Sequence, residues 1–484
     1  MNNEKVLVRI VFMSTTLADK EKDFAQWYQD IIYAAELVDE SPVRGCYVIR
    51  PYAWRMWELM QDFLDERIRE TGHQNAAFPL LIPESFIKRE AEHVEGFSPE
   101  LAVVTHAGGK ELEEPLIVRP TSETTIHHSF SRWIKSWRDL PLKINQWANV
   151  VRWEKRPRPF LRTTEFFWQE GHTAHELLHE AEAEAQLMLN EYVSFIQGQL
   201  AIPVIVGQKT ESEKFAGADK TLAVESIMPD GKALQMCTSH LLSQNFAKAF
   251  GIIFQDREKN QSYPYLTSWG ITTRMIGALI MMHGDQKGLV LPPAVAPIQV
   301  IIIPIYRNDE EREAVHTQYD FIRTALEGLR TSFDEDMSKT PGAKFYHWEM
   351  RGVPLRLEIG KRDAIAKQVV LVNRMTGEKT IVPFEKLSTT VEQSLDSFQN
   401  KLYEQAREKM DKNINVGEKL EEFGPTLEKD GGAFITGWCG DPLCEQELKK
   451  YKAFTRCLLE THTLSTCFNC GKPSNCDVLV AKAY

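Results

Sequence analysis

Apolar and polar positions alternate along the chain with two different periods, which predict helices and strands in mixed order. Residues 18–36 and 54–70 repeat bulky apolar side chains every three or four positions, which is typical of amphipathic helices. Residues 142–154 and 163–175 are rich in β-branched and aromatic side chains, and the loop of prolines and arginines between them predicts a strand pair. Helices mixed with antiparallel strands in this way indicate an α+β domain.

The pattern changes at residues 289–297, where a proline-rich stretch without periodicity predicts a linker. The apolar run at 298–306 then predicts a buried strand, and a charged helix is expected over residues 308–329. Further strand patterns at 352–360 and 367–374 indicate an α/β domain. At about 100–200 residues per domain, we expect domains at 1–290, 297–395 and 396–484.

Composition and charge exclude several classes of protein. With 43% hydrophobic and 26% charged residues, the chain is typical of a globular protein and not of a disordered one. The formal net charge of −11 argues against a strongly basic nucleic-acid coat, although it leaves room for a local basic face. No apolar run approaches the roughly 18 residues of a membrane span. The N-terminus resembles mature protein and not a signal peptide, so we expect a cytoplasmic protein without membrane association.

Cysteines gather at the C-terminal end of the chain. Cys439 and Cys444 are separated by four residues, and Cys467 and Cys470 by two, which is a paired-thiolate pattern suited to tetrahedral Zn²⁺. Cys457 falls outside this pattern, as does Cys476. Four thiolates would leave no open position on the metal, which predicts a structural site. Disulfides remain the alternative, and the absence of a secretion signal disfavours them.

The glycine-rich nucleotide motifs GxxxxGK[ST] and GxGxxG are absent from the sequence. If ATP binds to this protein, arginine side chains must therefore bind its phosphates. Arg152 and Arg162 flank the loop of the predicted strand pair, and Arg274 begins a predicted helix, where the helix dipole also favours an anion. Any one of these arginines would more often form an ordinary surface salt bridge. Taken as a set, they favour an anion site.

His175-Glu-Leu-Leu-His179 matches HExxH, the pattern of zinc proteases, and we expect it to lie on a helix, as that pattern requires. In a chain with 13 histidines such a match arises readily by chance. We therefore interpret it as incidental and do not expect protease activity.

Four segments occur in an order that resembles the active-site motifs of class II aminoacyl-tRNA synthetases. They are RPTSE (119–123), the segment 152–175, CTSH (237–240) and SWGITTRMIG (268–277). Within that class they resemble the prolyl-tRNA synthetases, in the eukaryotic or archaeal-like form. The resemblance implies an α+β catalytic domain with an antiparallel sheet, an α/β anticodon-binding domain and a zinc-bearing C-terminal domain. It also implies a homodimer, formed through the helix at 54–72 and a strand at 78–79.

The resemblance further implies the substrates L-proline, ATP with Mg²⁺, and tRNA(Pro), together with the residues that take them. Arg152 and Arg274 would be catalytic. Proline would be bound by Thr121, Glu123, Arg152, Trp168, His172, Phe215 and His240. ATP would be bound by Arg152, Glu154, Arg162, Thr163, Gln235, Thr238, Thr272 and Arg274.

Three more expectations follow from the same resemblance. Glu225 is expected to bind Mg²⁺, and Glu358 and Arg362 to read anticodon guanines. Some prolyl enzymes carry a large editing insertion between the RWE and TTR motifs. Only core sequence separates Arg152 from Arg274 here, so we expect no such insertion.

Two other functions remain as alternatives. The first is a non-catalytic paralogue that binds tRNA or a protein, against which the intact Arg152, Glu154 and Arg274 argue. The second is a synthetase of the same class for threonine or serine, in which a metal or a different carboxylate would occupy the amino-acid pocket.

Overall fold

The computed structural model describes residues 17–93 and 101–484, which form two compact units. The smaller unit contains residues 17–39, 48–55 and 283–398. The larger contains residues 40–47, 56–282 and 399–484. None of the helices in the described ranges has the length and apolar character needed to cross a membrane.

The smaller unit is built on a mixed five-stranded sheet with the order β16-β15-β17-β18-β19. β15 pairs in parallel with β16 and β17, whereas β17, β18 and β19 pair antiparallel. The apolar run of β15 is buried on both faces of the sheet, because Ile302 joins one hydrophobic cluster while Ile301 and Ile303 join another. The strands are β15 (Val300–Ile305), β16 (Thr331–Phe333), β17 (Leu355–Gly360), β18 (Gln368–Asn373) and β19 (Lys379–Pro383). The α-helices that lie wholly in the described part of this unit are α1 (Phe24–Ala34), α8 (Asp309–His316), α9 (Tyr319–Ala325), α10 (Pro341–Met350) and α11 (Lys361–Ala366), and α12 (Leu387–Lys412) begins in it.

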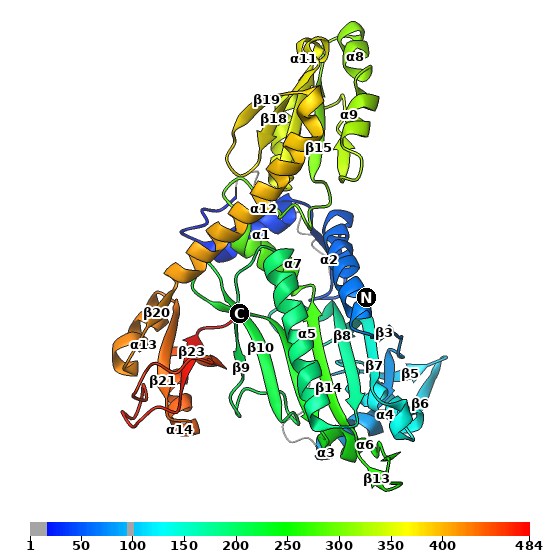
Figure 1. Ribbon diagram of the computed structural model, residues 1–484, viewed down its shortest axis with the longest axis vertical. Coiled ribbons are helices and arrows are strands. Elements are labelled where there is room, and N and C mark those ends of the chain that lie inside the picture. The colour runs from blue at the N-terminus through cyan, green and yellow to red at the C-terminus, as the bar shows by residue number, and fades with distance from the viewer. Residues whose placement is uncertain (1–16, 94–100) are drawn as a thin grey trace, which may run out of the picture. The chain divides into compact units, whose positions relative to one another are not determined.

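The larger unit contains an eleven-stranded sheet with the order β20-β21-β23-β22-β9-β10-β11-β14-β8-β7-β3. From β9 to β7 every neighbouring pair is antiparallel. Helix α5 (Leu178–Gly198) packs across β8, β10, β11 and β14, so one face of this part of the sheet is covered (Figure 1). One part of this sheet contains β3 (Gln74–Asn75), β7 (Leu142–Val151), β8 (Glu165–His175), β9 (Ile205–Gln208), β10 (Lys220–Ile227), β11 (Ala233–Ser243) and β14 (Tyr265–Thr272). The C-terminal strands are β20 (Ile414–Val416), β21 (Ala433–Trp438), β22 (Phe454–Leu458) and β23 (Cys476–Ala481).

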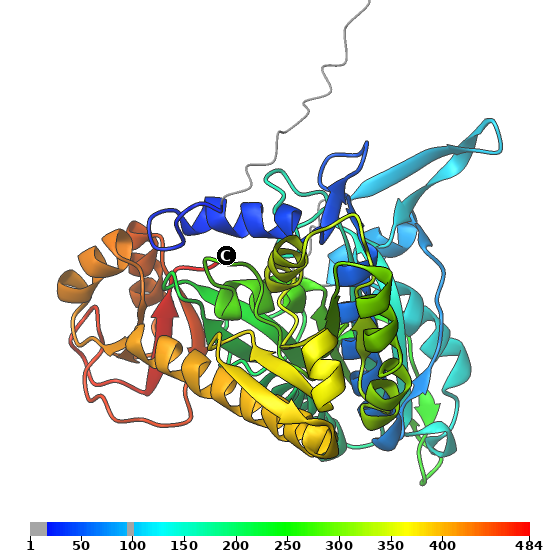
Figure 2. The ribbon, with the colours of Figure 1, turned by 90° about the horizontal axis from the view of Figure 1, so that it is seen from above.

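The C-terminal residues extend the catalytic sheet, because Leu458 of β22 pairs with Gln208 of β9. Residues 399–484 therefore share a compact unit with the catalytic strands. The domain boundaries that the sequence suggests stay predictions. At another place in the same unit, β5 (Ala102–Ala107) and β6 (Lys110–Val118) form a long hairpin that extends away from its neighbours (Figure 2).

The described residues also form further helices and strands. They are β1 (Val38–Glu40), β2 (Tyr47–Ile49), α2 (Pro51–Glu70), β4 (Leu81–Pro83), α3 (Glu84–His93), β5 (Ala102–Ala107), β6 (Lys110–Val118), α4 (Glu123–Trp133), α6 (Asn245–Phe250), β12 (Phe254–Gln255), β13 (Gln261–Ser262), α7 (Arg274–His283), α13 (Leu420–Lys429) and α14 (Pro442–Gln446).

The structure corrects two predicted elements. The helix expected over residues 308–329 is two helices, α8 and α9, separated by Thr317 and Gln318. The strand expected at 78–79 is absent from the described chain, since β4 begins only at Leu81. Phe78 instead donates its backbone N–H to the side chain of Gln146, which replaces a strand partner.

Candidate active site

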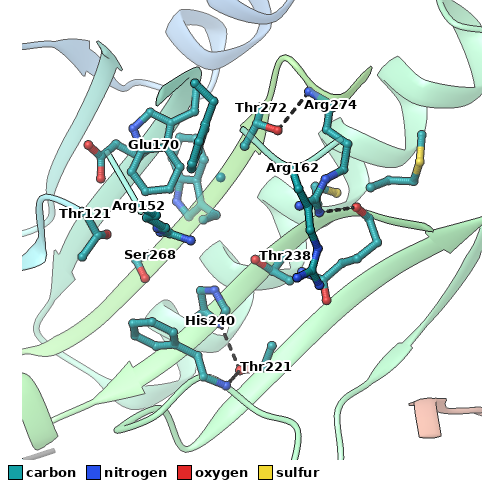
Figure 3. A pocket seen from close by; sticks show the side chains of 18 of the residues that line it. Thr121, Arg152, Arg162, Glu170, Thr221, Thr238, His240, Ser268, Thr272 and Arg274 are labelled. Carbon is teal, nitrogen blue, oxygen red and sulfur yellow. Dashed lines mark hydrogen bonds between the residues drawn. The ribbon is translucent and has the colours of Figure 1, made fainter. Parts of the chain in front are cut away.

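A cavity of about 520 Å³ opens on the sheet of the larger unit. This volume lies in the range of small-molecule sites, roughly 300–1,000 Å³. Every residue that the resemblance implies for proline or ATP lines this cavity (Figure 3). They come from β8, β11 and β14, from the segments that follow β6, β7 and β9, and from the first residues of α4 and α7. These residues are Thr121, Glu123, Arg152, Glu154, Arg162, Thr163, Trp168, His172, Phe215, Gln235, Thr238, His240, Thr272 and Arg274.

The alternation of β8 explains which of its side chains reach the cavity. Gln169 hydrogen-bonds Tyr192 of α5, on the covered face of the sheet. Trp168, Glu170 and His172 therefore point to the opposite face, and all three line the cavity. We did not predict Glu170 from the sequence, although it stands midway between two predicted residues. Strand alternation was the signal that could have found it.

Ser268 was also missed. It pairs in register with His172 of β8 on one side and with His240 of β11 on the other. Cross-strand partners present their side chains on one face, so the register brings all three to the same wall. Only the order of the strands reveals this, because the three residues are far apart in the sequence.

Glu170 is buried and organises the floor of the cavity. Its carboxylate accepts hydrogen bonds from Ser122 Oγ, from Gln146 Nε2 at 2.8 Å and from His172 Nε2 at 3.0 Å. Burial alone would raise its pKa, but the His172 contact and the two neutral donors outweigh burial and lower it. Burial likewise opposes the charged form of His172, yet the hydrogen bond and charge of Glu170 raise its pKa. The pair therefore favours an imidazolium–carboxylate contact.

Three arginines converge on the same cavity. Arg274, at the start of α7, donates through Nη1 to the carbonyl of Gln235 at 3.1 Å and through Nε to that of Leu161 at 3.3 Å. Burial, followed by the positive charges of Arg162 and Arg152, lowers the pKa of Arg274 to about 10. Like charges held this close favour an anionic ligand, which would remove their mutual repulsion.

Arg162 and Arg152 occupy opposite ends of this group. Arg162 Nη2 donates to the carbonyl of the C-terminal Tyr484 at 3.2 Å, and Nη1 lies 3.8 Å from Glu154 Oε2. Arg152 Nε donates to the carbonyl of Pro120 at 2.9 Å, and its guanidinium lies 5.5 Å from the ring centroid of Trp168. Each arginine keeps nitrogen donors that these contacts do not use.

His240 is held neutral beside Phe215. Burial, followed by the charge of His172, lowers the pKa of His240 to about 3. Its Nδ1 lies 3.0 Å from Thr221 Oγ1, which also accepts the backbone N–H of Phe215 (Figure 3). The Phe215 and His240 rings lie 4.8 Å apart. These two rings, inclined by 37° to each other, form an aromatic wall.

Four residues that line the cavity carry a buried polar atom without a hydrogen-bond partner within the described chain: Trp168 Nε1, His172 Nδ1, Ser268 Oγ and Trp269 Nε1. A buried polar group without a partner costs about 1–3 kcal/mol. The cavity is therefore suited to a ligand or waters that would pair with these atoms.

Glu225, the predicted magnesium ligand, does not line this cavity. Its carboxylate is fully buried and accepts from Lys209 Nζ at 2.7 Å and from the guanidinium of Arg456 at 3.0–3.2 Å. Because two fixed cations already occupy its oxygens, Glu225 has no free face for Mg²⁺. The geometry therefore contradicts this prediction.

The HExxH match does not lie on one helix, contrary to the sequence-based expectation. His175 is the last residue of β8, whereas His179 is the second residue of α5. His175 is buried with Nε2 at 2.8 Å from Thr173 Oγ1, and His179 is exposed. The two histidines lack the shared helix face that metal binding requires.

The sulfur atoms of Cys439, Cys444, Cys467 and Cys470 lie within 4.8 Å of one another, as predicted. Cys439 Sγ is 3.8 Å from Cys444 Sγ and 3.7 Å from Cys470 Sγ. Tetrahedral zinc with Zn–S bonds of about 2.3 Å would separate its sulfurs by about 3.8 Å, so the cluster fits this metal. Burial raises the pKa of Cys467, but backbone N–H groups outweigh it and lower that pKa to about 7.

The two predicted anticodon residues belong to the smaller unit. Glu358 of β17 is buried and pairs with Arg356 at 2.9 Å and with Lys379 at 3.1 Å. Arg362, in the first turn of α11, is exposed. The segment therefore carries both signs of charge next to each other.

Family models match most of this chain. The tRNA synthetase class II core domain (G, H, P, S and T) matches residues 104–283. The anticodon binding domain matches residues 299–394, and the prolyl-tRNA synthetase C-terminal domain matches residues 420–484. None of these three is an editing domain.

Whole-length relatives give the same picture. The chain is 47% identical to a proline–tRNA ligase of Natranaerobius thermophilus over 100% of this chain and 99% of the relative. It is 49% identical to one of Symbiobacterium thermophilum over 100% of both. A crystal structure of prolyl-tRNA synthetase from Cryptosporidium parvum, complexed with L-proline and AMP, has a TM-score of 0.90. It is 40% identical, and the alignment covers 97% of this chain and 99% of that one.

Proposed function

The chain belongs to the proline–tRNA ligases, class II aminoacyl-tRNA synthetases, and on that premise we propose how its residues divide the reaction. The enzyme joins L-proline to tRNA(Pro) with ATP, through a prolyl-adenylate. The observation that carries the assignment of roles is that all the proline and ATP residues expected from the resemblance line one cavity.

In the first step a carboxylate oxygen of proline attacks the α-phosphorus of ATP. A carboxyl–phosphate bond forms, the bond to the β-phosphate oxygen breaks, and pyrophosphate leaves. Positioning and charge stabilisation dominate such a displacement. Arg152, beside Trp168 and nearest to the amino-acid wall, would bridge the carboxylate and the α-phosphate. Arg274 and Arg162 would hold the outer phosphates, since their unused donors face the same cavity.

The adenine end of ATP would lie along Glu154 and Thr163. Gln235, Thr238 and Thr272 would supply further polar contacts from β11 and β14. Mg²⁺ would enter on the phosphates of ATP and reduce their charge. Glu225 takes no part, for the reason given above.

Proline would occupy the wall formed by Trp168, Phe215 and His240. A five-membered ring suits flat aromatic surfaces, and a secondary ammonium needs acceptors. Thr121 and Glu123 are buried and hydrogen-bonded to each other, and they would accept from the ammonium. His172, fixed by Glu170, would complete the floor.

The four-cysteine cluster would hold one structural Zn²⁺, since four thiolates complete a tetrahedral shell without an open position. Bound zinc would fix the C-terminal loops and would not take part in catalysis.

In the smaller unit, Glu358 and Arg362 would read anticodon guanines. Carboxylates accept from the imino and amino groups of guanine, and arginine reaches O6 and N7. Glu358 now pairs with Arg356 and Lys379, so guanine would compete with these cations for its oxygens. This competition would favour a base that offers two donors at once.

We also propose that the enzyme is a homodimer. β3 is the last strand at one end of the large sheet, and Gln74 and Asn75 are exposed there. A free sheet edge of this kind can be covered by a second copy. Sedimentation equilibrium would test this, and a monomer at micromolar concentration would contradict it.

ATP–pyrophosphate exchange with each of the twenty amino acids tests the function. We expect exchange with L-proline and little with the others. No exchange with any amino acid would support the non-catalytic alternative, and exchange with threonine or serine would support the other synthetase.

A further inference from the structure

The segment between β9 and β10, residues 209–219, lines the active-site cavity, yet the C-terminal part of the chain holds it in place. Lys209, Glu213, Lys214 and Phe215 all belong to the cavity wall. Their positions depend on contacts with residues more than 200 positions further along the chain.

The first of these contacts is made by Glu445 in α14. Its carboxylate is buried and accepts from Thr210 Oγ1 at 2.8 Å through Oε1, and from Ser212 Oγ at 2.6 Å through Oε2. Both oxygens are therefore engaged by the same short turn. Hydrogen bonds to a charged acceptor are among the stronger ones in proteins.

The second contact lies at the start of the segment. Lys209 Nζ donates to Glu225 at 2.7 Å and to the backbone carbonyl of Arg456 at 2.7 Å. Arg456 also belongs to the C-terminal strands, in β22. Residues 209–212 are thus fixed at both ends by C-terminal groups.

The fixed turn sets the position of Phe215. Thr210 accepts the backbone N–H groups of Glu213 at 3.1 Å and Lys214 at 2.9 Å, so the turn is built on Thr210. The next residue, Phe215, donates its N–H to Thr221 and packs on His240. A displacement of Thr210 would therefore reach the aromatic wall within a few residues.

Apolar packing contributes little at this contact. A small cavity of about 90 Å³ is lined by Ser212 and Glu213 of the segment and by Pro442, Glu445 and Phe454 of the C-terminal part. Because this void leaves packing incomplete beside α14, the two hydrogen bonds of Glu445 are the direct polar contacts that hold the turn at Thr210 and Ser212 to that helix.

We propose that Glu445 is a positioning residue that holds the 210–215 turn, and through it Phe215, in the geometry that binds the amino acid. Glu445 does not touch the substrate. It follows Cys444, so the helix that would present a zinc ligand also presents this carboxylate. The proposal rests on the proposed function, in which Phe215 packs against the proline ring.

The test compares Glu445→Ala, Glu445→Gln and Ser212→Ala with the control Glu447→Ala, whose residue pairs instead with Lys450. For Glu445→Ala we expect the KM for proline to rise about tenfold. The variant loses two hydrogen bonds to a charged acceptor, and the loss of such bonds weakens affinity by about this factor. The KM for ATP should change less than twofold. Glu445→Gln keeps an acceptor oxygen and should recover part of the affinity. The control should match the wild type.

Two further measurements separate positioning from general damage. Zinc content by elemental analysis should be unchanged in every variant. Hydrogen–deuterium exchange of the peptide covering residues 209–218 should speed up in Glu445→Ala and not in the control. If Glu445→Ala does not fold, Ser212→Ala should still raise the KM for proline about threefold with the same faster exchange, because it removes one of the two bonds.

An unchanged KM for proline and unchanged exchange in Ser212→Ala would overturn the proposal, as would equal rises in the KM for proline and ATP. Failure of the proposed function looks different. In that case the wild type would not exchange pyrophosphate with proline, while the hydrogen-exchange comparison would still report on the turn.

Discussion

Two buried glutamates of the same sheet, Glu170 and Glu225, have opposite surroundings. Glu170 is 2% exposed and Glu225 is fully buried, so burial does not distinguish them. Glu170 contacts one titratable partner, His172, beside polar atoms that have no partner. Glu225 instead contacts two basic side chains, the ammonium of Lys209 and the guanidinium of Arg456.

The comparison shows that an active-site carboxylate is recognised by neighbouring polar groups that still lack hydrogen-bond partners. Around Glu225 both carboxylate oxygens already accept from Lys209 or Arg456, so a ligand would have to displace a cation. Around Glu170, His172 can gain or lose its proton, and Ser268 and Trp168 have unused polar atoms. Substitutions should therefore affect stability at one glutamate and activity at the other.

The largest effect is expected for Glu225→Gln. The amide leaves Lys209 and Arg456 buried without a counter-charge, and removing one partner of a buried ion pair costs about 3–5 kcal/mol. We expect a correspondingly lower free energy of unfolding, measured by chemical denaturation. A variant as stable as the wild type would remove the distinction between the two glutamates.

Arg152→Ala should come next, and its effect should be on catalysis. A charge-assisted contact formed mainly in the transition state contributes about 3–4 kcal/mol, or two to three decades in rate. Pyrophosphate exchange should fall by that factor while circular dichroism stays unchanged. Near-normal exchange would contradict the role of Arg152.

Glu170→Gln should lower kcat/KM for proline roughly thirtyfold, because His172 loses a charged acceptor. This factor corresponds to about 2 kcal/mol of activation free energy. Stability should fall less than in Glu225→Gln, since the partner is a histidine that can become neutral when its carboxylate is removed. Parallel denaturation and exchange assays on the two variants would measure both halves of this difference. Equal losses of stability would count against the comparison.

The same contrast explains what could be predicted from the sequence. The paired strands β7 and β8 could be predicted from local patterns, whereas the cavity residues came from the resemblance of four ordered motifs to those of the synthetases. The surroundings of Glu225 could not be predicted, because Arg456 lies 231 residues further along the chain. A β-bulge between Val224 and Glu225 also interrupts the alternation that would predict on which face of the sheet the Glu225 side chain lies.

Other misses have equally physical causes. Glu170 could have been predicted, because Trp168 and His172 are two positions away on either side. The break in the helix at 317–318 could not have been predicted, since a helical pattern continues through a short break. HExxH misled on secondary structure because the match spans the end of β8 and the start of α5.

The smallest effect concerns the two histidines of the HExxH match. Like the two glutamates, they differ in their surroundings, because His175 is buried and His179 is exposed. Burial lowers the pKa of His175 to about 4 from 6.5 in the unfolded chain. Between these values the unfolded state binds the extra proton and the native state does not, so stability falls as pH drops from 6.5 toward 4. At pH 5 this amounts to about 2 kcal/mol relative to pH 7. We expect His175→Gln to lose this part of the pH dependence in denaturation series at pH 7, 6 and 5.

His179→Ala, at an exposed position, should keep the wild-type pH dependence and the wild-type pyrophosphate exchange. If His179→Ala abolished exchange and released a bound metal, the HExxH match would be functional after all.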